Sequence, residues 1–168
     1  MTFFLKNTPF IPLLFGSVFF YLIVGFGPLN PENLSWIFGR FDPPQHYLGW
    51  VFYRYSPWSF PIGLNPNFGM DISSSIVYTD SIPIMAIFFK LLSPILPQVF
   101  QYFGIWLLLC FLLQAWFAWK IISLISSHFW VIFFGTGLLF FSPPMFWRLS
   151  LTHPDPGSPA GMQMSGSF

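Results

Sequence analysis

Three long apolar runs dominate the hydrophobic pattern of the chain. Residues 10–28 carry no charged side chain, and neither do residues 103–119, within the second run at 99–122. The third run covers residues 129–147. A helix needs about twenty apolar residues to cross a bilayer, so the pattern predicts three transmembrane helices at these positions.

Lys6 sets the orientation that we expect for these helices. Residues 1–9 precede the first run, and Lys6 is the charged residue among them. Basic residues favour the cytoplasmic side, which places residues 1–9 and the short turn 123–128 in the cytoplasm. A signal peptide would begin in the same way, but no small-residue cleavage site follows the first run, so we expect it to stay uncleaved.

Residues 29–98 are more polar and are predicted to form a long outer loop. Prolines punctuate the first part of this interval, so only short helices fit there. We expect helices at about residues 34–41 and 46–55, rich in aromatic side chains that suit the membrane interface. In the latter helix, helical spacing places Tyr47, Trp50, Val51 and Arg54 on one face.

A third short helix is predicted at residues 82–93, although the apolar run there resembles a membrane span. The run Ile82–Leu96 is shorter than a bilayer requires, and Lys90 lies in its middle. The sequence therefore favours an amphipathic helix on the membrane surface, with Lys90 turned to water and Asp80 or Ser81 as its N-cap.

The C-terminal segment, residues 148–168, differs from the rest in composition. Gly, Pro and Ser dominate its later part. Such a segment buries too little apolar area to offset its ordering entropy, so an outer, disordered tail is predicted. Its abrupt onset suggests a chain that is truncated, or shifted in frame, after the third membrane run.

Composition agrees with an all-α integral membrane protein. Of 168 residues, 55% are hydrophobic and only 7% charged, too few charges to cover a soluble surface. The net charge of +1 gives no electrostatic case for binding nucleic acid. With Cys110 as the one cysteine, the chain can build neither an internal disulfide nor a cysteine-based metal site.

The outer loop also holds the best candidates for chemistry. Asp42, followed by Gln45 and His46, can act as a general base or hold a divalent cation, although an N-cap role for Asp42 ahead of Pro43 is about equally compatible with the pattern. Asp71 and Asp80 offer further carboxylates in the loop, although a cap or a solvated position also fits each of them. Arg54 can grip a phosphate or pair with a carboxylate or lipid headgroup.

The order of these parts resembles the N-terminal part of the GT-C class of polytopic glycosyltransferases, closest to bacterial membrane proteins of a family of unknown function. The segments that carry the resemblance are FDPPQHYLGWVFYRYSPWSFPIG, SSSIVYTDSIPIMAIFFKLL and QYFGIW. The resemblance implies a bacterial inner-membrane location and a polyprenyl-phosphate sugar as the donor. It implies that Asp42 is the catalytic base or metal-associated residue, and that Arg148 lies near the donor phosphate.

The candidate site from residues and resemblance together contains Asp42 as the catalytic residue and a set of substrate-binding residues: Gln45, His46, Arg54, Asp80 and Arg148. Full-length GT-C enzymes have more spans than this chain, so we expect the 168-residue product to be inactive alone. Two alternatives stay open. A small membrane scaffold or subunit would dock a membrane-protein partner and tolerate loss of Asp42. Part of a transporter would need polar groups at mid-membrane, and Gln114 alone does not meet that need.

Overall fold

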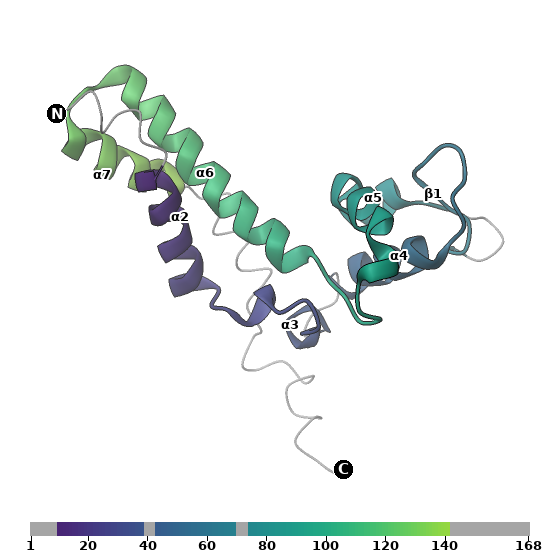
Figure 1. Cartoon of the computed structure of the whole chain (residues 1–168). Helices are drawn as coiled ribbons and strands as arrows, with labels where there is room; N and C mark the ends of the chain where they lie inside the picture. The colour runs from purple at the N-terminus through teal and green to yellow at the C-terminus, as the bar shows by residue number, and fades with distance from the viewer. Residues whose placement is uncertain (1–9, 39–42, 70–73, 142–168) are drawn as a thin grey trace, which may run out of the picture. The chain divides into compact units, whose positions relative to one another are not determined.

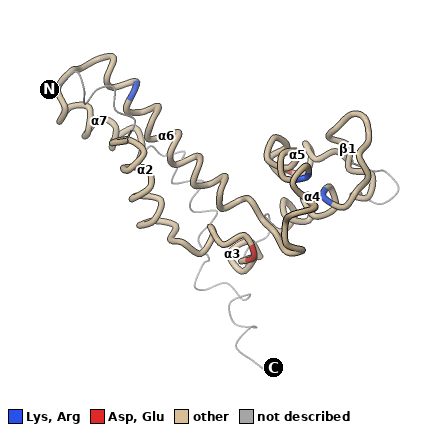
Figure 2. The backbone as a smooth tube through the Cα atoms, viewed as in Figure 1, with Lys and Arg blue, Asp and Glu red and all other residues tan. Residues whose placement is uncertain are grey.

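The computed structural model describes residues 10–38, 43–69 and 74–141 of the chain (Figure 1). These residues are mostly helical, and they divide into two compact units. Unit 1 contains residues 10–30 and 103–141, and unit 2 contains the described residues between 31 and 102. Among the charged side chains of this part of the chain, only Lys120 belongs to unit 1, whereas Glu32, Arg54, Asp80 and Lys90 belong to unit 2 (Figure 2).

Unit 1 is built on the long helix α6 (Phe103–Ile125), against which α2 (Phe10–Ile23) and α7 (Phe129–Phe140) both pack. Its core joins the aromatic rings of Phe20, Phe111 and Phe140 around Ala115. Helix α2 approaches α6 closely at Gly16, where an added Cβ would lie 2.9 Å from the carbonyl oxygen of Phe111. A glycine at such a contact lets two backbones meet, as in membrane helix pairs.

Of the three predicted membrane helices, one meets the length requirement within the described residues. Helix α6 has 23 residues and is long and apolar enough to cross a bilayer. Helices α2 and α7 are apolar but shorter, with 14 and 12 residues. Helix α2 stops before Gly25, whose φ of 79° breaks the helix, and the short 3-10 turn η1 (Gly27–Leu29) follows. Three membrane spans therefore remain a prediction, and the predicted tail lies outside the described residues.

Unit 2 combines short helices with one pair of very short strands. Its elements are α3 (Ser35–Phe38), α4 (Pro43–Tyr55), β1 (Leu64–Asn65), β2 (Ser74–Ser75), η3 (Ile76–Thr79), α5 (Pro83–Leu91) and η4 (Ser93–Ile95). The strands are antiparallel, with Leu64 opposite Ser75 and Asn65 opposite Ser74. This two-residue ladder is the one departure from an all-α pattern among the described residues.

The core of unit 2 lies on one face of α4. The side chains of Trp50 and Tyr53 are fully buried, and Tyr47 and Arg54 are nearly so. The indole of Trp50 donates a hydrogen bond of 3.0 Å to the carbonyl of Phe100, and its ring packs on Tyr102. The buried face therefore contains Tyr47, Trp50 and Arg54, three of the four residues that helical spacing placed together, whereas Val51 is only partly buried.

The start of α5 contradicts the predicted cap. Asp80 instead ends η3 in a left-handed conformation, and the residue that precedes α5 is Ile82, which makes no side-chain cap. Ser81 turns its hydroxyl towards α4, where it donates to the carbonyl of His46. Ser81 is thus used for a tertiary contact, which local capping preferences do not foresee, and Asp80 stays exposed.

The orientation predicted for Lys90 is also wrong. Its side chain is only 5% exposed, and Nζ donates a hydrogen bond of 3.0 Å to Ser56 Oγ. The ammonium lies 4.0 Å from the ring centre of Tyr53 and 4.7 Å from that of Trp58. Such cation–π contacts compensate a buried ammonium by about 0.5–2 kcal/mol each, so Lys90 faces the interior of unit 2.

Candidate functional site

The predicted site residues separate into three groups in the structure. Gln45 and His46 lie on the first turn of α4, and Asp80 lies in the turn between η3 and α5. Arg54 lies at the opposite end of α4. Asp42 and Arg148 lie outside the described residues. Among the described candidates, the side chains of Gln45 and Asp80 are exposed and that of His46 is half-buried, so these three are accessible to a ligand.

His46 connects α4 to the turn that carries Asp80. Its Nδ1 lies 3.1 Å from the carbonyl oxygen of Thr79. Because a carbonyl only accepts hydrogen bonds, Nδ1 carries the proton in this contact. In the neutral ring Nε2 then holds the free lone pair, which is the form that a general base or a metal ligand requires. The residue next to the carbonyl that orients His46 is Asp80.

A buried hydroxyl cluster of Thr79, Ser81 and Tyr102 fixes this turn. Ser81 Oγ lies 2.6 Å from the His46 carbonyl and 2.8 Å from Thr79 Oγ1. The Tyr102 hydroxyl donates to the carbonyl of Ser81. Burial raises the pKa of the Tyr102 hydroxyl, with a smaller contribution from Tyr53, so Tyr102 stays a hydrogen-bond donor. Several independent bonds therefore determine one geometry for residues 79–81.

Gly49 makes this close approach of α4 and the turn possible. An added Cβ would overlap the Cβ of Thr79 and lie 2.7 Å from Ser81 Oγ. On the other side of the helix backbone, Asn65 donates from Nδ2 to the Gly49 carbonyl at 3.0 Å. A glycine in the middle of α4 thus serves packing, at a cost in helix propensity of about 1 kcal/mol.

The same turn contains two non-glycine residues with positive φ. Asp80 and Ile82 both have φ of 50°. For a β-branched residue such as Ile82 this conformation is strongly disfavoured, and it persists only where neighbours hold it. Here the buried cluster around Ser81 supplies that constraint. The exposed carboxylate of Asp80 is consequently held at a fixed place beside the first turn of α4.

Arg54 is fully engaged within unit 2. Its Nε donates to Ser93 Oγ at 3.0 Å, Nη1 to the carbonyl of Gln98 at 3.1 Å, and Nη2 to the carbonyl of Leu96 at 3.1 Å. These bonds fasten the segment after α5 to the end of α4. The phosphate-binding role expected for Arg54 is therefore not carried into the function proposed below.

The interior next to Arg54 contains the second cation, Lys90. Desolvation lowers the pKa of the Lys90 ammonium, and burial raises the pKa of the Tyr53 hydroxyl that it faces. The Tyr53 hydroxyl donates to the carbonyl of Ile62 at 2.5 Å. Tyr53 therefore joins the aromatic cage of Lys90 to the loop before β1, and this cage is a packing device.

A metal centre is not assembled by the described residues alone. They contain no group of three or more His, Cys, Asp or Glu side chains close enough to hold an ion. His46 and Asp80 offer two ligand types suited to a divalent cation. A third ligand would have to come from outside the described ranges, and Asp42 directly precedes α4 in the sequence.

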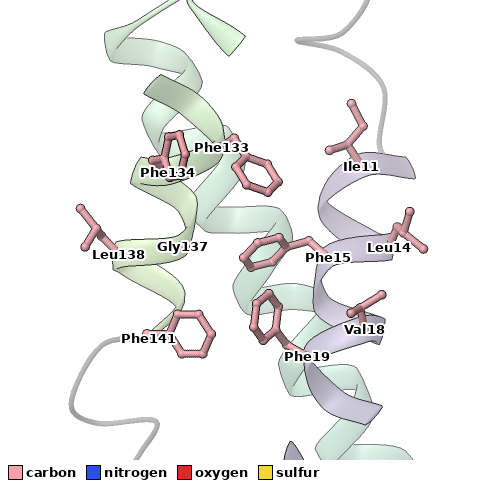
Figure 3. A pocket seen from close by; sticks show the side chains of 10 residues that line it. All are labelled: Ile11, Leu14, Phe15, Val18, Phe19, Phe133, Phe134, Gly137, Leu138 and Phe141. Carbon is pink, nitrogen blue, oxygen red and sulfur yellow. The ribbon is translucent and has the colours of Figure 1, made fainter. Parts of the chain in front are cut away.

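Unit 1 offers a site of a different kind, an apolar groove between α2 and α7 (Figure 3). Its volume is about 750 Å³. The side chains of Phe15 and Phe19 on α2 face those of Phe133 and Phe141 across it, and Gly137 lies on the α7 side (Figure 3). No lining residue has a polar side chain, so this groove can bind hydrocarbon but performs no acid–base chemistry.

Sequence reasoning selected His46 and Asp80 as candidates, a prediction that stays untested, but it did not predict the contacts of the residues that position them. Thr79, Ser81 and Tyr102 are polar residues of ordinary kinds, and nothing in their spacing marks a cluster. The one local signal is Gly49, since a glycine inside a helical pattern indicates a close approach or a break.

Comparison with protein families gives one match: the family described as Domain of unknown function (DUF6311) covers residues 13–155. No curated protein and no solved structure is significantly similar to the chain. The family match covers most of the chain and both of its units. The protein therefore belongs to the DUF6311 family.

Proposed function

We propose that this member of the DUF6311 family is a multi-pass membrane protein of the bacterial inner membrane with a GT-C-like transferase site in unit 2. In this proposal α2, α6 and α7 belong to three membrane-spanning segments, with residues 1–9 in the cytoplasm. The length of α6 and the apolar character of α2 and α7 support it. Unit 2 then lies on the outer side, where a lipid-linked donor presents its sugar.

The observation that carries the transferase proposal is the constrained turn at residues 79–82 beside the first turn of α4. It orients the His46 ring through Nδ1, so that Nε2 carries the lone pair in the neutral tautomer, and it holds the Asp80 carboxylate nearby. Strained, over-determined backbone of this kind is concentrated at functional sites. Asp42, which the resemblance assigns as base or metal-associated residue, immediately precedes this turn of α4 in sequence.

The chemistry that we propose is sugar transfer from a polyprenyl phosphate to an acceptor hydroxyl. Asp42, or His46 through Nε2, removes the proton of the acceptor, and Gln45 and Asp80 bind sugar hydroxyls. The bond between the sugar and the phosphate oxygen breaks, and the polyprenyl phosphate leaves as an anion. Arg148 neutralises that anion. A divalent cation held by Asp42, His46 and Asp80 is an optional part of the site.

The proposal is tested by donor turnover in lipid nanodiscs that contain the full chain. The probe is a polyprenyl-phosphate hexose with a radiolabelled sugar, supplied with and without Mg²⁺ or Mn²⁺. Added glycerol, or water, provides the hydroxyl that bonds to the anomeric carbon as the phosphate leaves. Full-length GT-C enzymes have more spans, but the described residues already place His46 beside the turn that carries Asp80. In this proposal the chain therefore releases polyprenyl phosphate by itself, and removing a general base with Asp42→Asn or His46→Gln lowers turnover by about 10²–10⁴-fold. A chain that binds the donor without cleaving it would instead support the expectation of an incomplete enzyme. Lys120→Gln, in unit 1, is the matched control and should leave turnover unchanged.

The apolar groove in unit 1 favours a second candidate function, that of a non-enzymatic membrane subunit. A groove lined by phenylalanine rings provides a surface for a membrane partner without any chemistry. The same assay separates the two functions. A chain that neither binds nor cleaves the donor excludes the transferase, whereas donor cleavage that depends on Asp42 or His46 excludes a purely structural role.

A further inference from the structure

Helix α5 has an inverted distribution of polar and apolar side chains. Ile84, Phe88, Leu91 and Ile95 are spaced four, three and four residues apart along α5 and η4, with exposed fractions of 79%, 53%, 64% and 79%. We call these four residues the α5 stripe. On α5 the spacing of Ile84, Phe88 and Leu91 forms one face, and Ile95 follows in η4. The face that α5 turns outward is thus entirely aliphatic and aromatic.

The opposite face of α5 carries its one charge. Lys90 and Ala86 are four residues apart and both buried, and Lys90 lies in its cage of Tyr53 and Trp58. A helix on the surface of a soluble domain shows the reverse arrangement, with charges outward. Polar groups turned inward and apolar groups turned outward are the arrangement of a segment surrounded by lipid.

Other segments of unit 2 expose further aromatic side chains without adding charge. Trp58, Phe60 and Tyr78 are 52%, 90% and 80% exposed. Asp80 is the one charged side chain that the described segments 55–69 and 74–102 leave exposed. An anionic headgroup would find no free cation there, since Arg54 and Lys90 both turn their donors inward.

Unit 2 is joined directly to α6 along the chain. Tyr102 is buried in the core of unit 2, and the next residue, Phe103, begins α6. Residues at the two ends of the segment 31–102 are hydrogen-bonded to each other, because the backbone amide of Gln101 donates to the carbonyl of Pro31 at 2.8 Å. Each residue extends a chain by at most about 3.6 Å, so a membrane-crossing α6 leaves no linker by which unit 2 could move away from the bilayer surface.

From these observations we propose that the α5 stripe inserts among the acyl chains of the bilayer, and that its insertion does not depend on anionic lipid. The occupant of this face is uncharged hydrocarbon, which matches its residues. The inference rests on the proposal that the protein is a membrane protein, but it does not depend on sugar transfer. It replaces the expected surface orientation, in which Lys90 would have faced the water.

The test places a fluorescent label on single cysteines in the full chain in phosphatidylcholine nanodiscs. The natural cysteine is removed with Cys110→Ala, and bimane is attached to Ile84→Cys or, in a second chain, to Ile95→Cys. Asn67→Cys, at an exposed polar loop position, is the matched control. Two quenchers are compared: a doxyl group on the lipid acyl chain, and iodide in the water.

We expect loss of fluorescence at positions 84 and 95 with the doxyl lipid and little with iodide, and the opposite at position 67. Quenching of the two stripe labels by iodide would overturn the proposal. Protection from both quenchers would also overturn it, because another protein surface or a second copy would then cover the stripe. Doxyl quenching at all three positions would overturn the assignment of this face, since unit 2 would be immersed as a whole.

The lipid composition tests the second part of the inference. Replacing part of the phosphatidylcholine by phosphatidylglycerol should leave doxyl quenching at positions 84 and 95 unchanged. An increase that salt reverses would show that anionic headgroups drive insertion, and would overturn charge independence. A chain that does not enter nanodiscs at all would overturn the membrane proposal itself, whereas an inserted chain without donor turnover affects only the transferase.

Discussion

Unit 1 and unit 2 are held together by different forces. In unit 1 glycine and alanine let helices approach, and phenylalanine rings fill the space between them. A side-chain hydrogen bond between two of its helices runs from Gln114 to the carbonyl of Phe140. Unit 2 also buries hydroxyls, two carboxamides and two cations, most of them with hydrogen-bond partners. Dispersion forces tolerate small shifts, whereas hydrogen bonds fix a geometry, so we place the chemistry in unit 2.

The first of the large effects on stability that we predict comes from adding a methyl group at Gly49, where α4 contacts Thr79. Gly49→Ala adds a Cβ that overlaps Thr79, and overpacking of this kind costs about 1–3 kcal/mol. Hydrogen exchange followed by mass spectrometry should show faster exchange in α4 and in residues 74–102, with α6 unchanged. Gly63→Ala, whose added Cβ would lie 3.3 Å from Ser75 Oγ, is the control and should keep its protection. Equal loss in both units would contradict their independence.

Two glycine-to-leucine substitutions in unit 1 compare the close contact of α2 with α6 and the apolar groove. Gly16→Leu forces a side chain against the α6 backbone, 2.9 Å from the carbonyl of Phe111, and should destabilise by about 1–3 kcal/mol. Gly137→Leu projects into the groove, where the nearest atom to an added Cβ is Phe15 Cζ at 3.9 Å. We expect it to be neutral or to stabilise by up to about 1 kcal/mol, through helix propensity. Thermal unfolding in detergent measures both, and equal destabilisation would show that the groove is already filled.

The sequence predicted helices and buried faces, which follow from periodic spacing, but few of the features that depend on tertiary contacts. The apolar runs and the spacing of Tyr47, Trp50 and Arg54 indicated helices and the buried face of α4. Membership in a family of unknown function was also anticipated, although the glycosyltransferase relationship stays a proposal.

The errors arose where long-range contacts compete with local rules. Lys90 reaches the aromatic residues 53 and 58, which lie more than thirty positions earlier in the chain, so local amphipathicity gave the wrong face. Asp80 and Ser81 have good capping chemistry, but the contact of Ser81 with His46 takes precedence. The bonds of Arg54 with residues 93–98 are equally distant in sequence. No periodicity in one sequence reports such pairings.

Substitutions of Lys90 test whether the buried charge itself is needed for the stability of unit 2, and we expect a smaller effect than at the glycines. Lys90→Met keeps the length of the side chain and removes a charge that makes no ion pair with any described residue. The lost cation–π contacts and the avoided desolvation oppose each other, so we expect a change within about 1 kcal/mol at neutral pH. Lys90→Ala also removes packing and should cost about 2 kcal/mol or more. Urea unfolding of unit 2, followed by tryptophan fluorescence, measures the difference.

The pH dependence of the free energy of unfolding gives a second test of the buried Lys90. The pKa of Lys90 is lowered in the folded protein, so the unfolded chain binds more protons between that pKa and 10.5, and stability rises with pH across this window. The pKa values of Tyr53 and Tyr102 are raised above 10, so stability falls as pH rises above about 10. Lys90→Met should lose the rise and keep the fall. A wild-type protein without the rise would show that the ammonium is solvated.

The smallest predicted effect on stability bears most directly on the site. Asp80→Gly relieves a left-handed conformation that costs a non-glycine residue up to about 1–2 kcal/mol, and Asp pays less than most, so we expect stabilisation of about 0.5–1 kcal/mol. Asp80→Asn keeps the backbone preference and should leave stability unchanged. If the carboxylate binds substrate, both variants lose donor turnover in nanodiscs although one of them is more stable. If the turn is merely structural, turnover follows stability, and Asp80→Asn behaves as the natural protein does.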